Sequence, residues 1–151
     1  MKIIVRTFEG FEEILSAEIF QITNIKPEIG KRAVYLDGGL EIIYSLNLWS
    51  RLALDVLVEL HHYKASNEDE LYNGAYEFIW DNEFSIHETF SIASVVNSPF
   101  FNHSKYASLK IKDAIVDQFN KKFGKRPSVD RENPDHKFVV RISHDQVNLL
   151  W

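Results

Sequence analysis

The sequence contains no cysteine among its 151 residues, which excludes disulfides and thiolate metal sites and fits a reducing compartment. The first fifteen residues include Glu9, Glu12 and Glu13 and have no apolar block of the signal-peptide kind. No segment approaches the ~18–20 consecutive apolar residues of a membrane span. These absences predict a soluble, cytoplasmic protein with no membrane partner.

Motifs for catalysis and cofactor binding are also missing. The sequence has no nucleophile elbow, no Walker loop and no GxGxxG after an expected strand. Its six histidines show no HxxxH spacing, which argues against a metal site. Gly38 and Gly39 lie between an expected strand and an expected helix, but they lack the glycine spacing that cradles a phosphate. We therefore expect no catalytic, cofactor or metal site in this chain.

Charge is unevenly distributed along the chain. The net charge of the whole protein is −5, yet residues 101–151 carry ten basic and six acidic side chains, a net charge of +4. Residues 105–126 alone contain seven basic and two acidic side chains, a net charge of +5. A positive island in an acidic protein is typical of a local site for a polyanion such as a nucleic-acid backbone.

The periodicity of the first sixty residues predicts the order strand, helix, strand, strand, helix, strand. This order is that of the ferredoxin-like split βαβ motif, and we expect that domain to span residues 1–62. The expected elements are strands over 2–7, 26–30, 31–37 and 52–60 and helices over 11–23 and 40–48.

Residues 61–69 are polar and are predicted to connect this domain to a second one. A mixed α/β domain is expected over residues 63–151, so the fold class is α+β. The last strand reaches Trp151 without a polar terminator, and we expect the chain to be a fragment of a longer protein. The expected elements are helices over 71–79 and 102–123, a strand over 88–96, and a hairpin of strands 136–143 and 146–151.

The helix over 102–123 carries most of the positive island. Asn102 or Ser104 is expected to cap its start, and Gly124 provides the left-handed residue that ends many helices. At about 100° per residue, Lys105 and Lys112 fall at nearly the same azimuth, beside the apolar stripe. The two lysines form either a phosphate-binding ridge or snorkelling side chains on a solvated face. The stripe that faces the core is predicted to contain Ala107, Ile111, Ile115, Phe119 and Phe123.

Two neighbouring segments have the same ambiguity. The run Lys125-Arg126-Pro127-Ser128 joins two cations to a hydroxyl group and could hold phosphate oxygens, or it is an ordinary turn. Phe100, Phe101 and Tyr106 flank the helix start, where they could stack on unpaired bases. Such a cluster more often forms a hydrophobic lid over a helix end, and we favour the lid.

Five segments together resemble a known family. They are LNLWSRL at 46–52, DELYNGAYEFIW at 69–80, TFSIASVV at 89–96, SLKIKDAIVDQF at 108–119 and RPSVDRENPD at 126–135. In order and spacing they are similar to the N-terminal region of bacterial large-subunit rRNA guanine-N2 methyltransferases. That region pairs a ferredoxin-like domain with a THUMP domain, so the resemblance covers nearly the whole chain. One departure is Asp55, where the family often has arginine.

The resemblance implies an RNA-binding module that positions 23S rRNA for a catalytic domain on the same polypeptide. That domain, C-terminal to the THUMP domain, would be a Rossmann-like methyltransferase using S-adenosylmethionine, and its cofactor loop and Asn-Pro-Pro motif have no counterpart here. The resemblance also implies that Asp113 and Asp117 are structural. The residues that it implies nearest RNA are Lys105, Lys110, Lys112, Lys125, Arg126 and Ser128.

Two alternatives stay open. Other THUMP proteins modify tRNA, as methyltransferases or thiouridine synthases, so the substrate RNA is not determined by the resemblance. A different class of function, a structural module that docks a protein through the basic helix, also fits the charge pattern. Salt dependence separates them, because binding to phosphates weakens steeply with salt.

Overall fold

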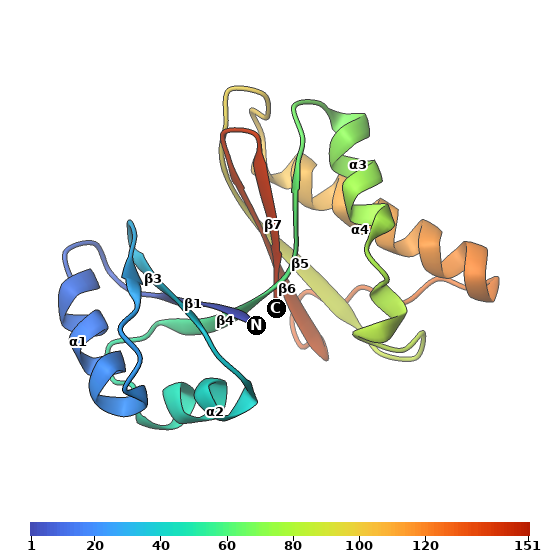
Figure 1. The fold of residues 1–151 in the computed structure, drawn as a ribbon. Coiled ribbons are helices and arrows are strands. Elements are labelled where there is room, and N and C mark those ends of the chain that lie inside the picture. The colour runs from blue at the N-terminus through green and yellow to red at the C-terminus, as the bar shows by residue number, and fades with distance from the viewer. The chain divides into compact units, whose positions relative to one another are not determined.

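The computed structural model describes all 151 residues, which form two compact units, Met1–Glu59 and Leu60–Trp151 (Figure 1). Strand β4 (Asp55–Lys64) contributes its first half to the first unit and its second half to the second. None of the helices combines the length and hydropathy that crossing a membrane requires. The expected α+β class is confirmed, and each unit is described below by itself.

The first unit has the predicted ferredoxin-like order. Its strands lie in the order β2-β3-β1-β4, with antiparallel pairing throughout, and two helices follow β1 and β3 in the chain. The split βαβ pattern read from the sequence is therefore present. The elements are β1 (Lys2–Arg6), α1 (Glu12–Thr23), β2 (Glu28–Ile29), β3 (Ala33–Asp37), α2 (Leu40–Trp49) and the start of β4.

Alternation along β1 sorts its side chains between the two faces of this sheet. Ile3 and Val5 belong to the buried core with Leu15 and Ile19 of α1, four residues apart and so on one face of that helix. On the opposite sheet face, Arg6 donates two hydrogen bonds to Asp55. Nε donates to Oδ1 at 2.7 Å, and Nη2 donates to Oδ2. Asp55, where the resembling family often has arginine, therefore serves a cross-strand ion pair with β1.

The second unit combines a mixed sheet with two helices. Its strands lie in the order β4-β7-β6-β5, with β5 parallel to β6 and β6 antiparallel to β7, so β5 is the edge strand. The predicted hairpin around His144 and Asp145 is confirmed. The elements after β4 are α3 (Glu68–Glu77), the 3₁₀ turn η1 (Trp80–Asn82), β5 (Phe90–Asn97), α4 (Ser104–Phe123), β6 (His136–Ser143) and β7 (Gln146–Leu150).

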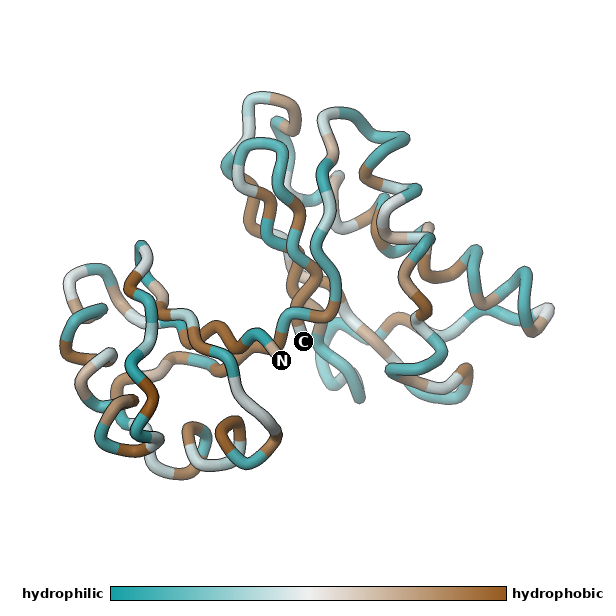
Figure 2. Tube along the Cα trace, in the orientation of Figure 1, coloured by the Kyte–Doolittle hydropathy of each residue, from teal (hydrophilic) through white to brown (hydrophobic).

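Both helices cover one face of this sheet and bury its apolar side chains (Figures 1 and 2). The largest fully buried side chain is Trp80 of η1, whose Nε1 donates to the carbonyl of Ala75 at 2.8 Å. From α4 the core receives the predicted residues Ala107, Ile111, Ile115 and Phe119. Figure 2 shows the turn between β6 and β7 as hydrophilic, in contrast to the strands that it joins.

The polar connector expected over residues 61–69 was wrong. Strand β4 continues to Lys64, and α3 starts at Glu68 after Asn67, whose Oδ1 accepts from the backbone N–H of Glu70 at 2.9 Å. The ring of His61 stacks on Tyr63 with centroids 5.3 Å apart, so a side chain that reads as polar packs in a strand. Histidine and tyrosine can bury an apolar ring surface, which polarity alone does not reveal.

Two expectations for α4 were also wrong. No side chain caps its start: His103 occupies the N-cap position, and Ser104 is already helical. Phe123 does not belong to the core, since it is 46% exposed in the last turn of the helix, where its ring contacts Phe119. The expected end is confirmed, because Gly124 adopts a left-handed φ of 67° and donates to the carbonyl of Asn120.

Other boundaries moved by a few residues. The strand expected over 26–30 is only Glu28–Ile29, and the one expected over 88–96 is Phe90–Asn97. The helix expected over 71–79 begins and ends earlier in the chain, at Glu68 and Glu77, directly after its N-cap residue Asn67. None of these shifts changes the order of elements, because periodicity defines an element better than its ends.

Candidate nucleic-acid interface

A groove of about 450 Å³ runs along the free edge of β5 in the second unit. Helix α4 forms one wall through Lys105, Ser108, Leu109 and Lys112, and the loop after α4 forms another. The strand itself contributes residues 90–93. Because β5 is an edge strand, backbone groups line this groove together with side chains.

The loop that follows α4 is fixed to the start of β5 rather than free in solvent. The backbone N–H of Phe90 donates to the carbonyl of Ser128 at 3.1 Å, and the N–H of Asp130 donates to the carbonyl of Phe90 at 3.1 Å. Asp135 accepts from the backbone and the hydroxyl of Thr89, both at 2.8 Å. Within the loop, Pro127 is buried. These contacts hold Val129 and Arg131 in the groove wall.

Three cations and no carboxylates line the groove. Lys105 lies in the first turn of α4, Lys112 lies about one turn beyond Ser108, and Arg131 belongs to the loop. Lys112 pairs with the neighbouring Asp113 at 2.7 Å, and no carboxylate lies within ion-pair distance of Lys105 or Arg131. Even with the Lys112 charge partly offset by Asp113, the net positive charge around one concavity produces a local potential that attracts anions.

The shared azimuth of Lys105 and Lys112 is seen in the structure, since both residues line the groove. Lys110 lies elsewhere on α4. Its Nζ is 3.8 Å from a carboxylate oxygen of Glu68 and 5.7 Å from the ring centroid of Tyr106. The hydrogen bond to Tyr106 and the nearby carboxylate of Glu68 raise the pKa of Lys110. Its charge is therefore directed toward α3.

Lys125, Arg126 and Ser128 are exposed on the loop, outside the groove lining. No carboxylate lies within ion-pair distance of Lys125 or Arg126. Ser128 takes part in the structure through its carbonyl, which accepts from Phe90. Asp117, expected to be structural, accepts from the hydroxyl of Tyr72 at 2.9 Å and so joins α4 to α3.

Arg131 is the groove residue that the sequence did not reveal. Its neighbours Asp130 and Glu132 cancel its charge in any count over the loop, so the positive island ended at Arg126. In the structure, Oδ1 of Asp130 accepts from the backbone N–H groups of Glu132 and Asn133, at 2.9 and 3.1 Å. The Asp130 carboxylate is thus used within the turn. The sequence did contain a signal for a turn at Arg131, because Asp130, Asn133 and Pro134 are residue types that favour turns.

The fold defines the class of this protein, a ferredoxin-like domain followed by a THUMP domain. The model of the RlmL ferredoxin-like domain matches residues 2–57, and the THUMP domain model matches residues 65–150. The chain belongs to the THUMP domain family. The resemblance to the N-terminal region of large-subunit rRNA methyltransferases is confirmed.

Among curated relatives, the ribosomal RNA large subunit methyltransferase K/L of Desulfotalea psychrophila is 35% identical over 141 residues. The protein of the same name from Shewanella frigidimarina is 35% identical over 143 residues. Each match covers 93% of this chain and 20% of the relative, so the chain spans about a fifth of the length of these proteins.

A solved structure shows the same fold over nearly the whole chain. It is the crystal structure of a "predicted N6-adenine-specific DNA methylase" from Listeria monocytogenes, with a TM-score of 0.83 and 25% identity. The match covers 99% of this chain and 39% of that one.

Proposed function

We propose that this protein is the RNA-binding module of an rRNA-modifying methyltransferase and that the groove beside β5 contacts the RNA backbone. The observation that carries this proposal is the convergence of Lys105, Lys112 and Arg131 on one concavity, where only Lys112 pairs with a carboxylate, that of Asp113. The relatives named as ribosomal RNA large subunit methyltransferases support it. The substrate that we propose is 23S rRNA.

The groove recognises phosphate positions and RNA shape rather than sequence. Arg131 can hold two phosphate oxygens with its planar fork, whereas Lys105 and Lys112 act as point charges. Phosphate contacts fix register and orientation but carry no sequence information. The module therefore positions rRNA for a methyl transfer to guanine N2 that a C-terminal domain of the longer protein performs.

The adjacent glycines of this chain do not support a loop for S-adenosylmethionine, the cofactor of that reaction. The only adjacent glycines, Gly38 and Gly39, face their own helix: a Cβ at Gly38 would meet the side chain of Ile42 at 2.9 Å, and one at Gly39 the carboxylate of Glu41 at 2.4 Å. This glycine pair leaves no cradle for the cofactor. We propose that the cofactor is bound by the C-terminal catalytic domain.

The expected RNA residues outside the groove are ranked by their surroundings. Lys125 and Arg126 are exposed and unpaired, so we propose that they contact phosphates at the margin of the groove, with Ser128 as a neighbouring hydroxyl. Lys110, whose charge is directed to Glu68, contributes less. We expect Lys105, Lys112 and Arg131 to contribute most to RNA binding, because all three line the same groove.

The test is a titration of the protein with a structured rRNA hairpin, followed by fluorescence anisotropy. The test variant is Lys105→Ala/Lys112→Ala/Arg131→Ala. The control variant, Lys26→Ala/Lys31→Ala/Arg51→Ala, removes the same charges from exposed positions of the ferredoxin-like unit. At ~50 mM salt we expect the test variant to bind about tenfold more weakly or worse, and the control to bind within about threefold of wild type.

Equal losses in both variants would show that net charge, not the groove, governs binding. No RNA binding by the folded wild-type protein at low salt would contradict the proposed function and favour a protein-docking role. Circular dichroism of each variant verifies that the groove substitutions leave the fold intact, since all three side chains lie at the surface.

A further inference from the structure

Phe100 is an exposed aromatic side chain at the far end of β5, in the loop that leads into α4. It is 46% exposed, whereas its neighbour Phe101 is 6% exposed and belongs to the core of the second unit. The lid that we favoured from the sequence is therefore made by Phe101. Phe100 is not part of the core, so burial of apolar surface in the core does not explain why an aromatic ring lies here.

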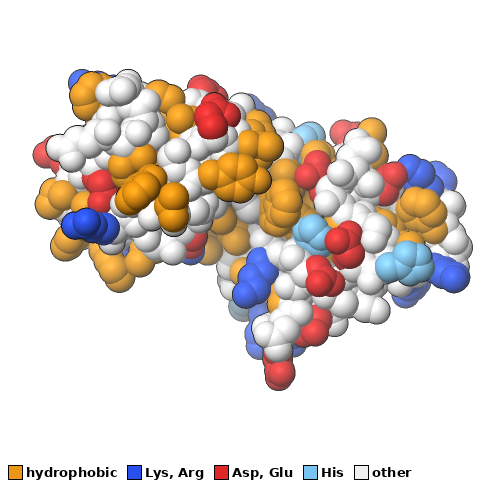
Figure 3. All heavy atoms as spheres, turned by 90° about the horizontal axis from the view of Figure 1, so that it is seen from below, with side chains coloured by type: hydrophobic (Ala, Val, Ile, Leu, Met, Phe, Trp, Pro, Cys, Tyr) orange, Lys and Arg blue, Asp and Glu red, His pale blue; other side chains and the backbone are white.

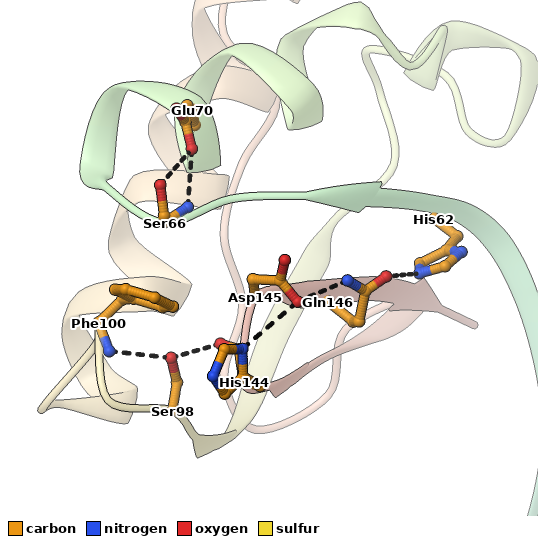
Figure 4. Close-up of polar contacts among 8 residues, drawn as sticks. All are labelled: His62, Ser66, Glu70, Ser98, Phe100, His144, Asp145 and Gln146. Carbon is orange, nitrogen blue, oxygen red and sulfur yellow. Dashed lines mark hydrogen bonds and ion pairs between the residues drawn. The ribbon is translucent and has the colours of Figure 1, made fainter.

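The ring of Phe100 lies against His144 at the tip of the β6–β7 hairpin (Figure 4). The two ring centroids are 5.4 Å apart, and the planes are nearly perpendicular, at 86°. His144 is 69% exposed at its side chain and adopts a left-handed φ of 56°. An edge-to-face pair of this geometry is favourable for aromatic rings.

Hydrogen bonds fix the loop to the hairpin tip. The hydroxyl of Ser98 donates to the carbonyl of His144 and accepts from the backbone N–H of Phe100 at 3.1 Å (Figure 4). The N–H of His144 donates to the carbonyl of Asn97 at 2.8 Å. Because these contacts hold the loop and the hairpin tip together before any ligand arrives, the protein would lose little conformational freedom on binding a ligand.

Phe100 lies in the connection between β5 and α4, and both of these elements line the proposed RNA groove. Phe100 precedes α4 by a few residues, and Lys105 in the first turn of α4 lines the groove. The hydroxyl of Ser94 on β5 donates to the carbonyl of Ser104, which joins this end of the strand to the helix start. The connection that carries Phe100 thus begins and ends on the two elements that hold the groove cations and the edge strand.

The charges around the rings favour a base over a phosphate. Oδ1 of Asp145 is 3.5 Å from Nδ1 of His144 and accepts from the side chain of Gln146, which also contacts His62 at 3.0 Å (Figure 4). The charged group beside His144 is thus the Asp145 carboxylate, which also interacts with Lys64, so no excess of positive charge attracts a phosphate there. The uncharged face of a base can instead stack on an aromatic ring.

We infer that the exposed ring of Phe100, held edge-to-face by His144, is a platform on which an unpaired RNA base stacks while the backbone of that RNA lies in the groove. This inference rests on the proposed function of the groove. Stacking is tolerant of sequence, so the platform selects for an unpaired nucleotide rather than for a particular base.

The test compares Phe100→Leu with Phe123→Leu. Both aromatic residues are 46% exposed, but Phe123 lies at the opposite end of α4, so it is a matched control. His144→Asn is a second platform variant, because asparagine tolerates a left-handed backbone. Each is titrated with two rRNA hairpins, one with a single unpaired base replaced by fluorescent 2-aminopurine and one fully paired in its stem with that base deleted.

We expect Phe100→Leu and His144→Asn to bind the first hairpin about fivefold more weakly or worse and the second like wild type. We also expect both variants to abolish the quenching of 2-aminopurine that wild type causes. The salt dependence of binding should not change, since no phosphate contact is removed. Phe123→Leu should behave like wild type in every respect.

Wild-type affinity and quenching in both platform variants, with binding still lost in the groove variant, would overturn the platform and leave the proposed function intact. Failure of wild type to bind either hairpin would overturn both proposals. Thermal unfolding of the variants by circular dichroism verifies that each is folded.

Discussion

Lys112 and Arg131 line the same groove, although Lys112 belongs to α4 and Arg131 to the loop that follows it. The loop reaches this position because residues 128–130 bind the backbone of Phe90 at the edge of β5. Arg131, which lies outside the basic helix, thereby joins Lys105 and Lys112 as the third cation of the groove.

The first prediction concerns Arg131. Reversing its charge with Arg131→Glu should weaken binding to an rRNA hairpin by about tenfold or more at ~50 mM salt. Lys137→Glu on β6 makes the same change in net charge at an exposed position outside the groove lining, and it should change affinity by less than about threefold. Fluorescence anisotropy measures both, and equal effects would remove Arg131 from the site.

A second prediction concerns Gly74 and Tyr63. A Cβ atom at Gly74 would lie 2.1 Å from Cδ2 of Tyr63, whose hydroxyl donates to the carbonyl of Leu71 at 2.8 Å. In a helix, alanine is more stable than glycine by about 1 kcal/mol. The clash with the Tyr63 ring, which its hydroxyl hydrogen bond holds in place, should cost more than this gain. Gly74→Ala should therefore lower the free energy of unfolding by about 1–3 kcal/mol.

Urea denaturation measures this change, with Asn73→Ala on the exposed side of α3 as the control, which should be neutral or slightly stabilising. If Gly74→Ala is as stable as the control, Tyr63 must have room to move, and the close packing of β4 on α3 is not a constraint.

A third prediction concerns Gln118 of α4, whose side chain holds the connection between α3 and η1. Its Nε2 donates to the carbonyls of Tyr76 and Phe78 at 2.7 and 2.6 Å, and its Oε1 accepts from the N–H of Trp80 at 3.0 Å. Gln118→Ala leaves these groups without a partner and should lower the free energy of unfolding by about 2–4 kcal/mol.

The matched control is Asn120→Ala, which truncates an exposed amide on the same helix and should change the stability by less than about 0.5 kcal/mol. Both are measured by urea denaturation followed by Trp fluorescence. A Gln118 variant as stable as the control would mean that water replaces its three hydrogen bonds.

A fourth prediction concerns acid stability. The backbone N–H and hydroxyl of Thr89 lower the pKa of Asp135, and the backbone N–H and hydroxyl of Ser66 lower that of Glu70. The unfolded chain therefore binds these protons at a higher pH than the folded protein does. The stabilisation is complete above the ordinary carboxyl pKa of about 4 and is lost as the pH falls through the lower, folded-state value.

Asp135→Asn should therefore reduce the difference in unfolding free energy between about pH 6 and pH 3. Glu77→Gln removes an exposed carboxylate that accepts no hydrogen bond, so it should leave that difference unchanged. Urea titrations at several pH values measure the effect. An unchanged pH profile in Asp135→Asn would show that the bonds to Thr89 do not favour the charged form.

The sequence predicted the elements with strong periodicity and missed what depends on packing in three dimensions. The stripe from Ala107 to Phe119 and the stop at Gly124 are local signals, and both are present. The extension of β4 through His61 was missed because the residues there are polar. The need for glycine at position 74 follows from its contact with Tyr63 of β4, which only the structure shows. Arg131 entered the groove through a backbone bridge between Phe90 and Val129, which no local pattern indicates.

The groove is the central claim, and an NMR titration of the isotope-labelled protein with an rRNA hairpin tests it most directly. The account predicts that the amide signals with the largest shifts belong to residues 91–93 of β5, to Lys105 and Lys112 of α4, and to Arg131. Shifts confined to residues 1–59, or spread evenly over the surface, would contradict it.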